Sequence, residues 1–455
     1  MKIVLIFMMF QQLLMAGVDS LTLNEAIQIL QTKNLEIKAA TLDVKIAQQD
    51  EQSISGAHWG KLDFIQDVAR SNDAGNVFGF KLTSREATFG DFGFADTNLP
   101  AQTDPAYMTT PPDSLNYPDD RNFFQSKLRY EVPLFTGFAL SSYGEIMHSM
   151  TKMKSLKKEA LINEKTFELR KSYYNMALLD NSIKNLSIIL TNIQRLETTT
   201  QSMIDVGYAK NIDLLEVKAK KGNVERLLGQ MNSNKTLLYH YISFLLNQKT
   251  SNIIVPNSEV PMPHLSDESI LSSNLDIQKA ATGLVIRKSM LSSEKASYYP
   301  TVGAFGEIAT ADDSFLGDAG KHQAYTVGAR LTWNIFNGGS DGSKIEKSKL
   351  ELLKMQSQVA LAKNGVSLQI AKIRTELKSV NEEIRSLNAE LELLDAIYKN
   401  YEGRYKEKLS SINDVIIKQS QQIEKILQLQ MAKNRRNEKI FALEKIANTK
   451  GHYND

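Results

Sequence analysis

The sequence predicts a mainly α-helical chain with some β-structure, built from two copies of one unit: a pair of strands followed by a long helical hairpin. The clearest sign is that PLFTGF, at residues 133–138, returns as NIFNGG at 334–339. Each copy ends a stretch of alternating polar and apolar residues, which is typical of a strand with one apolar face. Each copy also begins a helical run of about sixty residues, several times the mean of roughly 11–12 for globular helices. An internal duplication explains both transitions.

The alternating stretches predict four strands in two pairs. Apolar residues occupy the even positions of 124–134 and the odd positions of 325–335, and weaker alternation occurs in 59–70 and 298–310. Each strand therefore has two unlike faces. We expect Tyr130, Val132, Leu331 and Trp333 on an apolar face that contacts lipid, and Arg129, Glu131 and Arg330 on a charged face that lines a lumen.

The loops between paired strands differ in length. The first, about 71–120, is rich in Gly, Asp, Asn and Pro, whereas the second is the short segment ADDSFLGDAGKHQ. The copies are offset by 240 residues at NLEI (34) and NLDI (274), but by 201 at 133 and 334, so the first loop is about 39 residues longer. Copy one therefore has an enlarged loop.

Long helices with a 3.5-residue apolar period complete each copy. From Val366 to Tyr401 apolar residues follow steps of four and three, which predicts a left-handed coiled packing seam. An ordinary coiled coil or helical bundle would also explain this pattern. We predict outgoing helices over 140–202 and 341–400, and return helices over 211–247 and 413–446. The first return helix is expected to continue into 268–295, and the second into the N-terminal helix that begins at the capping box TLNE (22–25).

The N-terminus has the pattern of a secretory signal. MKIVLIFMMFQQLLMAG places Lys2 before an apolar core and ends in two small residues, which is the organisation of a cleaved signal peptide. A buried N-terminal helix is the alternative. No later stretch has the roughly 18 consecutive apolar residues that predict a transmembrane helix. The mature chain is therefore expected to be exported.

Composition excludes several classes of function. The net charge of +2 in 455 residues gives no sign of a nucleic-acid partner. The absence of cysteine excludes disulfides, thiolate catalysis and thiolate metal sites. The six histidines are scattered singly, without the spacing that places two metal ligands on one helical face. No nucleophile–base or paired-carboxylate arrangement stands out, so we predict no enzymatic activity, no metal site and no cofactor.

Four strands from one chain cannot form a membrane barrel alone. Membrane barrels need at least about eight strands, and an open sheet edge in lipid leaves backbone groups unpaired. We therefore expect several protomers to share a barrel. Pro133, Gly137, Gly338 and Gly339 are expected to turn the chain from strand to helix. FNGGSDGSK is a weak candidate for a phosphate loop, because it lacks the Gly-Lys-Ser/Thr ending and the βαβ context.

Together these features resemble the TolC-type outer-membrane efflux proteins (outer membrane factors). The resemblance rests on the exported N-terminus, the duplicated strand-strand-hairpin plan, the Phe-x-Gly turns at 135–137 and 336–338, and VGYAKNIDLLEVKAK (206–220). It implies a homotrimer in outer-membrane lipid, with a 12-stranded β-barrel to which each chain gives four strands. A periplasmic α-helical barrel would continue it.

The resemblance also implies a function and partners. Such proteins are passive exit ducts of tripartite efflux pumps or type I secretion systems, and act with a periplasmic adaptor (membrane fusion) protein and an inner-membrane transporter of RND or ABC type. The alternative is an exported coiled-coil structural or adhesion protein. The substrate is not specified, since drugs, metal ions, solvents and secreted proteins all leave through such ducts.

The resemblance assigns two tasks to the hairpin tips. Val206, Gly207 and Tyr208 match an adaptor-contacting Val-Gly-Leu segment, with Tyr in place of Leu. The corresponding tip of copy two, which includes Leu409 and Ser410, does not keep that motif. The motif that implies adaptor contact is therefore degraded on the second tip.

Pore gating is the second implied task. Asp414 aligns with an aspartate that forms a ring in the pore, Asp213 is its counterpart in copy one, and Tyr405 matches a constriction tyrosine. Ile417 replaces the family's second aspartate, and Ser410 replaces its latching arginine. Capping of the return helix is an equally good role for Asp213 and Asp414.

The predicted organisation follows the chain in order: signal peptide 1–19, N-terminal tunnel helix 20–56, first strand pair 57–138, first hairpin 139–249 with its tip near 203–211, equatorial proline-rich segment 250–267, second-repeat tunnel helix 268–297, second strand pair 298–338, second hairpin 339–447 with its tip near 401–412, and polar tail 448–455.

Overall fold

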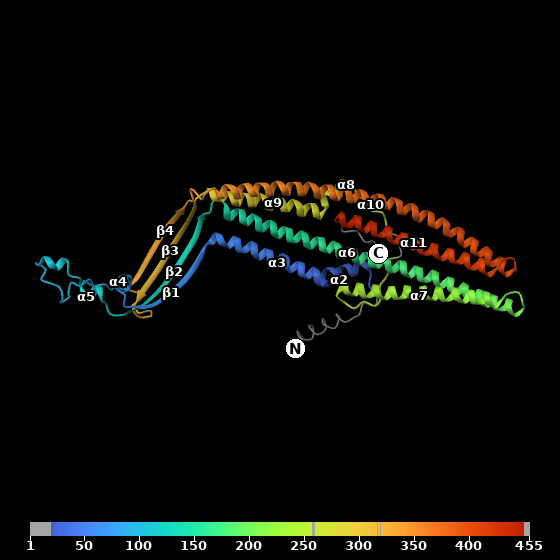
Figure 1. Ribbon diagram of the computed structural model, residues 1–455, viewed down its shortest axis with the longest axis horizontal. Coiled ribbons are helices and arrows are strands. Elements are labelled where there is room, and N and C mark those ends of the chain that lie inside the picture. Colours follow the sequence, from blue (N-terminus) through green and yellow to red (C-terminus); the bar gives the residue numbers. More distant parts are fainter. Residues whose placement is uncertain (1–19, 257–259, 316, 319, 450–455) are drawn as a thin grey trace, which may run out of the picture. The chain divides into compact units, whose positions relative to one another are not determined.

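The computed structural model describes residues 20–256, 260–315, 317–318 and 320–449 (Figure 1). The predicted signal peptide and residues 450–455 of the predicted tail lie outside this range. The chain divides into two compact units, one made of 1–46, 151–284 and 355–455, the other of 47–150 and 285–354. The second unit contains the sheet and the helix ends that join it. The first contains the hairpins.

The predicted strands form one antiparallel sheet in the order β1-β2-β3-β4. They are β1 Lys61–Ser71, β2 Arg121–Phe135, β3 Thr301–Asp312 and β4 Gln323–Thr332. The two pairs are joined through β2 and β3, with Tyr130 opposite Gly306. Strand β4 ends before Trp333, whose indole N–H donates to the carbonyl of Tyr298 at 3.3 Å. The prediction that Trp333 lies in the strand is therefore wrong.

The sheet has the two predicted faces. Leu62, Tyr130 and Val327 lie in one cross-strand row and are 62%, 42% and 76% exposed. On the other face, Lys61 pairs with Asp63 at 2.8 Å and with Glu131 at 3.6 Å. Alternation along an extended backbone produces this separation. The described chain thus presents an unpartnered apolar sheet face.

The long first loop is more ordered than its composition suggested. It contains α4 Ala74–Thr83, the 3-10 turns η2 Gly90–Phe92 and η3 Pro105–Met108, and the short α5 Asp113–Asn116. Asp73 begins α4 by accepting a hydrogen bond from the Asn76 N–H at 3.0 Å. Phe80 stacks on Phe123 of β2 with ring centroids 4.2 Å apart. Local capping and one aromatic contact therefore fix a helix in a segment predicted as a loop.

The strand-to-helix turns lie where the duplicated hexapeptide predicts. Gly137 has φ +62° in copy one, while Gly338 and Gly339 have φ +68° and +79° in copy two. Pro133 is not part of the turn. It lies within β2, paired with Gly303, next to a register shift in the β2–β3 pairing. Proline is compatible with this place because irregular pairing requires no donor from its nitrogen.

Two helices of 67 residues leave these turns (Figure 1). They are α6 Ala139–Asp205 and α10 Ser340–Lys406, and their return partners are α7 Asn211–Leu246 and α11 Ile412–Ile446. The heptad seam on α10 is confirmed, since Ile370 and Leu377 have no exposed surface. Apolar clusters between the helices include Ile440 and Phe441 of α11.

The half-length helices are each broken once. The N-terminal helix consists of α2 Leu23–Lys33 and α3 Leu35–Gly56, and the second consists of α8 Asp267–Ser273 and α9 Leu275–Lys295. The breaks fall at Asn34 and Asn274, both of which have extended backbone. The expected capping box is present at the start of α2, between Thr22 and Glu25.

The two asparagines also show which helices stand end to end. The Asn34 amide donates to the carbonyl of Leu245, at the end of α7, at 2.8 Å. The Asn274 amide donates to the carbonyl of Ile446, at the end of α11, at 2.9 Å. Helix α7 therefore meets α3, and α11 meets α9. The predicted pairing, 211–247 with 268–295 and 413–446 with the N-terminal helix, is wrong, because sequence adjacency does not decide the partner here.

None of the helices in the described residues is long and apolar enough to cross a membrane.

Candidate channel entrance at the hairpin tips

The two hairpin tips have the same backbone despite unlike sequences. In copy one the Gly207 N–H donates to the Ile204 carbonyl at 2.9 Å, and in copy two the Lys408 N–H donates to the Tyr405 carbonyl at 2.9 Å. Gly207 has φ +79° and Lys408 has φ +65°. Lys408 thus takes the left-handed conformation that glycine adopts without cost. The turn is duplicated even where the Val-Gly-Tyr motif is not.

Three predicted adaptor-contact residues are exposed apolar side chains. Val206, Tyr208 and Leu409 are 65%, 66% and 67% exposed. Tyr208 also joins the two tips, because the Lys408 ammonium lies 3.4 Å from the centroid of its ring. Ser410 is half-buried and donates to the carbonyl of Tyr401 at 3.3 Å. The tips therefore combine an apolar surface with a cation–π contact between the two sequence repeats of the chain.

Asp213 and Asp414 both cap the return helices. The Lys210 N–H donates to Asp213 at 2.8 Å, and the Ser411 N–H donates to Asp414 at 3.2 Å. The Ser411 hydroxyl adds a bond to the same Asp414 oxygen at 2.8 Å. Both aspartates stand three residues after the capping residue and are not the N-caps themselves. The Ser411 hydroxyl accepts from the Asp414 N–H at 3.2 Å and completes a capping box, whereas the Lys210 ammonium has no acceptor and leaves only the bond to Asp213.

Tyr405 lies between the two hairpins. Its side chain is 5% exposed, and its hydroxyl lies 3.1 Å from the Thr200 hydroxyl of α6. Burial raises the pKa of Tyr405, although the bond with Thr200 opposes that shift. The surrounding apolar cluster includes Val217 and Ile412. In this conformation the hydroxyl closes a contact between α6 and α10.

Lys220 forms a second polar contact between the copies. Its ammonium donates to the Ser420 hydroxyl of α11 at 2.5 Å, and burial lowers its pKa. Neither this contact nor the Thr200 partner of Tyr405 was predicted. Each joins residues about two hundred positions apart, and no local pattern marks such pairs.

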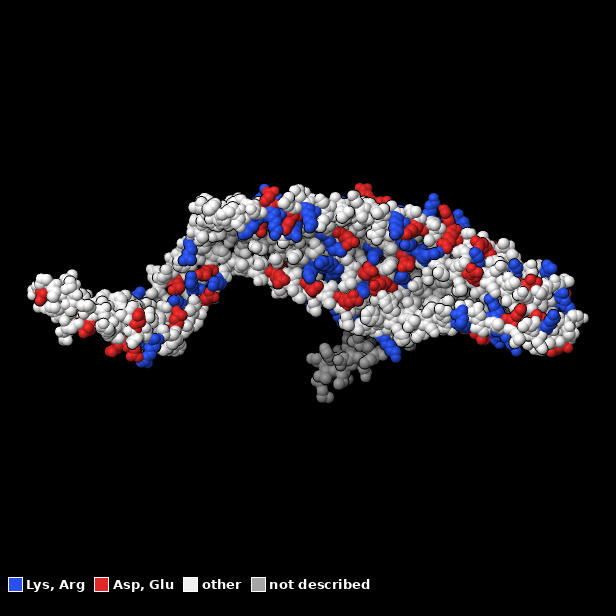
Figure 2. Space-filling model, in the orientation of Figure 1, with Lys and Arg blue, Asp and Glu red and all other residues white. Residues whose placement is uncertain are grey.

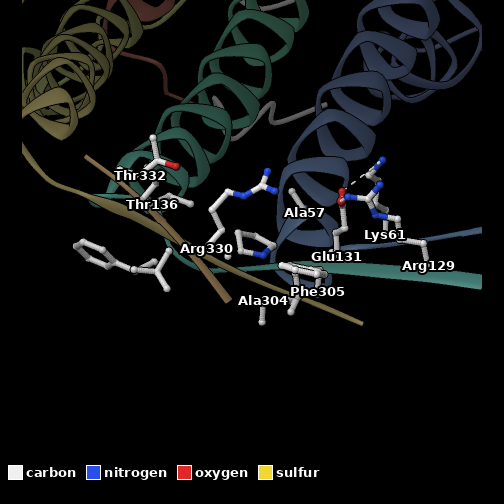
Figure 3. A pocket seen from close by; sticks show the side chains of 16 residues that line it. Ala57, Lys61, Arg129, Glu131, Thr136, Ala304, Phe305, Arg330 and Thr332 are labelled. Carbon is white, nitrogen blue, oxygen red and sulfur yellow. Dashed lines mark hydrogen bonds and ion pairs between the residues drawn. The ribbon is translucent and has the colours of Figure 1, made fainter. Parts of the chain in front are cut away.

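The charged face of the sheet borders a cavity of about 540 Å³ (Figure 3). Figure 3 shows Lys61, Arg129, Glu131 and Arg330 on one side of the strands and Ala304 on the other. The Arg129 guanidinium lies 2.5 Å from Glu131, which also faces Lys61. Arg330 reaches the same cavity from β4. The predicted charged residues are thus brought together.

Charges of both signs are interspersed over the helices on the face seen in Figure 2. Pairs of opposite charge between helices include Lys235 with Asp180 at 2.6 Å and Lys445 with Glu164 at 2.7 Å. The helical surface shown there has no extended area of a single sign. Such interspersed charges are typical of solvated helix faces.

Sequence comparison alone identifies no relative, since no protein-family model and no curated protein sequence matches this chain. Solved structures match it closely. CusC has 14% identity and a TM-score of 0.77, covering 93% of this chain and 91% of its own. The outer membrane protein VceC of Vibrio cholerae has 14% identity and a TM-score of 0.76, covering 94% and 96%. The MtrE outer membrane channel of Neisseria gonorrhoeae has 13% identity and a TM-score of 0.74, covering 94% and 88%.

These matches extend over both the sheet and the hairpins, because they cover nearly all of this chain. The resemblance predicted from the duplicated sequence plan is thereby confirmed at the level of the fold. The chain has the fold of the TolC-type outer-membrane channels.

Proposed function

We propose that this chain forms the outer-membrane channel of an export system and extends from that membrane into the periplasm. In this role it is a passive exit duct for substrates driven by an inner-membrane transporter, and has no catalytic activity. The observation that supports this most strongly is the fold match to outer-membrane channels over 93% or more of the chain. The two-faced sheet supports it independently.

The sheet requires that several copies associate, and the resemblance to the TolC-type channels implies three. Strands β1 and β4 each have one neighbour in the four-stranded order, so each leaves one edge of backbone groups unpaired. In lipid each unpaired group costs several kcal/mol. Three copies joined from β4 to β1 close a 12-stranded barrel, with the apolar face toward lipid and the cavity of Figure 3 toward the lumen.

The hairpin tips are the proposed entrance. Val206, Tyr208 and Leu409 present apolar surface to a periplasmic adaptor protein, beyond which an RND or ABC transporter supplies the substrate. Tyr405 and Thr200 hold the two hairpins together in the resting state. Asp213 and Asp414 stand at the starts of the return helices, where a trimer repeats each carboxylate three times around the axis.

An exported coiled-coil structural or adhesion protein is the alternative. It accounts for the heptad seam of α10. It does not explain the exposed apolar row of the sheet, because an apolar patch of this kind is rare on the surface of a soluble protein.

Planar-bilayer recording of the purified chain, together with its migration on gels before and after heating, tests the proposal. We expect a trimer that dissociates on heating and that conducts ions in discrete steps.

Leu331→Arg places a charge on the lipid face, which costs about 2–4 kcal/mol near the bilayer midplane, so less trimer should insert. Thr332→Arg is the matched control, because Thr332 lines the cavity on the charged face. A monomer without conductance would refute the channel, and equal insertion of both variants would refute the assignment of faces.

A further inference from the structure

Three side chains with metal-binding atoms meet at the loop end of the sheet. Glu86 lies in the first loop after α4, Asp312 is the last residue of β3, and His322 directly precedes β4. One candidate ligand atom from each lies within 4.8 Å of the other two. Among the residues that the structure describes, no other group of three or more His, Cys, Asp or Glu side chains meets this condition.

The histidine lacks a hydrogen-bond partner that its burial requires. The side chains of His322 and Asp312 are 13% and 10% exposed, and His322 Nδ1 lies 3.7 Å from Asp312 Oδ2. That distance exceeds a hydrogen bond, and Nδ1 is buried with no other partner. A buried polar atom without a partner is costly. A metal ion bound at Nδ1 would remove this cost.

Neighbouring groups hold the carboxylates in place. The N–H groups of Asp313 and Asp318 donate to the two oxygens of Asp312 at 2.6 and 2.5 Å. Arg121, at the start of β2, forms an ion pair with Glu86. Such hydrogen bonds and ion pairs orient metal ligands in known sites. They restrict the side chains without using all of their oxygen lone pairs.

The local charge favours a divalent cation. Glu86, Asp312 and Asp313 carry three negative charges, and Arg121, whose guanidinium lies 4.0 Å from Asp313, carries one positive charge. The three carboxylates therefore exceed the guanidinium by two negative charges in a partly buried place. A single divalent ion would balance them, and the low local dielectric makes this attraction stronger than it is in water.

We propose that Glu86, Asp312 and His322 bind one Zn²⁺-class divalent cation per chain. An imidazole with two carboxylates suits zinc better than magnesium or calcium, which prefer oxygen ligands alone. Three protein ligands leave a fourth position for water. Ligand atoms of a tetrahedral zinc site stand roughly 3.4 Å apart, given zinc bonds of about 2.0–2.1 Å, so separations of up to 4.8 Å must shorten by at most about 1.4 Å. The ion would tie the first loop to the β3–β4 loop.

Calorimetric titration of the purified full-length chain with Zn²⁺ at pH 7.5 tests this site. We expect one saturable site per chain, and Co²⁺ at the same site should give visible absorption bands that Zn²⁺ removes. His322→Gln and Glu86→Gln should each weaken Zn²⁺ binding roughly tenfold or more. His148→Gln is the matched control, because His148 Nδ1 lies 2.9 Å from Glu51 without a third ligand. The Zn²⁺ affinity of this variant should equal that of the original chain.

A second readout monitors the loop. Arg85 is exposed and precedes Glu86, so trypsin cleavage after Arg85 should slow when Zn²⁺ is added to the original chain, and should not slow in His322→Gln. Unchanged helicity by circular dichroism would show that the variants are folded. Absence of a saturable site, or Zn²⁺ affinity unchanged in His322→Gln, would overturn the proposal. Either result leaves the channel proposal intact, because conductance does not depend on this site.

Discussion

The strand-to-helix turn places two successive residues in the left-handed region in both copies. Copy two uses Gly338 and Gly339, whereas copy one uses Gly137 and Phe138, with φ +62° and +70°. A left-handed non-glycine residue costs roughly 1–2 kcal/mol. Phe138 offsets this cost through edge-to-face contacts with Phe135 and Tyr299, at 5.3 and 5.6 Å between ring centroids.

Gly338→Ala should therefore destabilise the chain by about 1–2 kcal/mol. An added Cβ at Gly338 has open space, so the cost arises from the backbone angle alone. Gly365→Ala is the matched control, since Gly365 lies in the interior of α10 with open space for a Cβ, where alanine is favoured by roughly 0.5–1 kcal/mol. Urea unfolding of the two variants should shift in opposite directions. Shifts of the same sign would contradict this account of the turn.

The buried asparagines give a second prediction at this scale. Asn274 accepts from the Ile277 N–H at 3.0 Å while donating to Ile446, and Asn34 does the same with Ile37 and Leu245. Alanine at either position leaves buried backbone groups unpaired, at a cost of about 1–3 kcal/mol.

Aspartate separates the two bonds, because Asn274→Asp keeps the acceptor for Ile277 and loses the donor to Ile446. It should also destabilise the chain in urea unfolding at pH 7. Asn223→Ala, at an exposed position on α7, is the control and should change stability by no more than about 0.5 kcal/mol. Full stability of Asn274→Asp would show that the donor bond to α11 is unimportant.

Residue roles were predictable only where local sequence determines them. The capping chemistry of Asp213 and Asp414 follows from their position at a helix start. The Thr200 partner of Tyr405 and the meeting of Glu86 with His322 depend on tertiary contacts between distant segments. In the sequence His322 is an isolated histidine, because nothing local shows that the two loops meet.

At the scale of elements, the second hairpin has a ladder of ion pairs with heptad spacing. Glu376, Glu383 and Glu390 of α10 each lie 2.6 Å from a cation of α11. The cations are Lys439, Arg435 and Lys425 in the same order. These flanking pairs accompany the apolar seam, as charges at the edges of a coiled-coil interface do.

The ladder predicts that the second hairpin loosens in acid. The hydrogen bond from Lys439 lowers the pKa of Glu376, and that from Lys425 lowers the pKa of Glu390, from an ordinary value of 4.5. A lowered folded-state pKa adds stability above the ordinary value, and this stability is lost as pH falls through the lowered pKa. Stability in urea should therefore fall below about pH 4.5.

The double variant Glu376→Gln/Glu390→Gln should reduce that acid dependence. High salt should reduce it in the original chain as well, because the pairs are partly exposed and therefore screened. Lys378→Ala, an exposed change on the same helix, should leave the acid dependence as it is. An identical pH profile for the double variant would show that other carboxylates cause the acid loss.

The sequence predicts where the long helices lie, but it does not predict which helices stack end to end. The 3.5-residue period of α10 is a local property and survives in the buried seam. The same period occurs on α6. It therefore does not specify which return helix, α7 or α11, stacks end to end with which half-length helix. The breaks at Asn34 and Asn274 were missed because the apolar pattern continues across them, and only the tertiary bonds to Leu245 and Ile446 define the stacking.

At the scale of the whole molecule, duplication and oligomerisation together set the symmetry. Each chain supplies two similar hairpins, so the proposed trimer has six similar tips around its axis. The two tips of a chain share backbone hydrogen bonds yet differ in side chains, with Gly207 matched by Lys408. Every residue facing the axis is repeated three times, and this amplifies the effect of a single carboxylate.

The gate prediction follows from that repetition. Three copies of Asp414 near the axis would form an acidic ring, which attracts cations in a narrow, partly desolvated space. Asp414→Asn should therefore reduce cation selectivity in planar bilayers. Ile417, where the resemblance implies a second aspartate, is 44% exposed, so Ile417→Asp should add a ring and increase selectivity. Asp213→Asn tests the counterpart in copy one.

Stability measurements separate gating from capping. Asparagine at 414 retains an oxygen acceptor for the Ser411 N–H but loses the charge that favours a helix N-terminus, which is worth about 0.3–1 kcal/mol. A gating role predicts a shifted reversal potential and weaker block by divalent cations in Asp414→Asn, with both effects smaller at high salt. If Asp414→Asn lowers only the unfolding midpoint and Ile417→Asp leaves the reversal potential unchanged, Asp414 serves the helix start alone, and the contact of Tyr405 with Thr200 remains the candidate for closing the entrance.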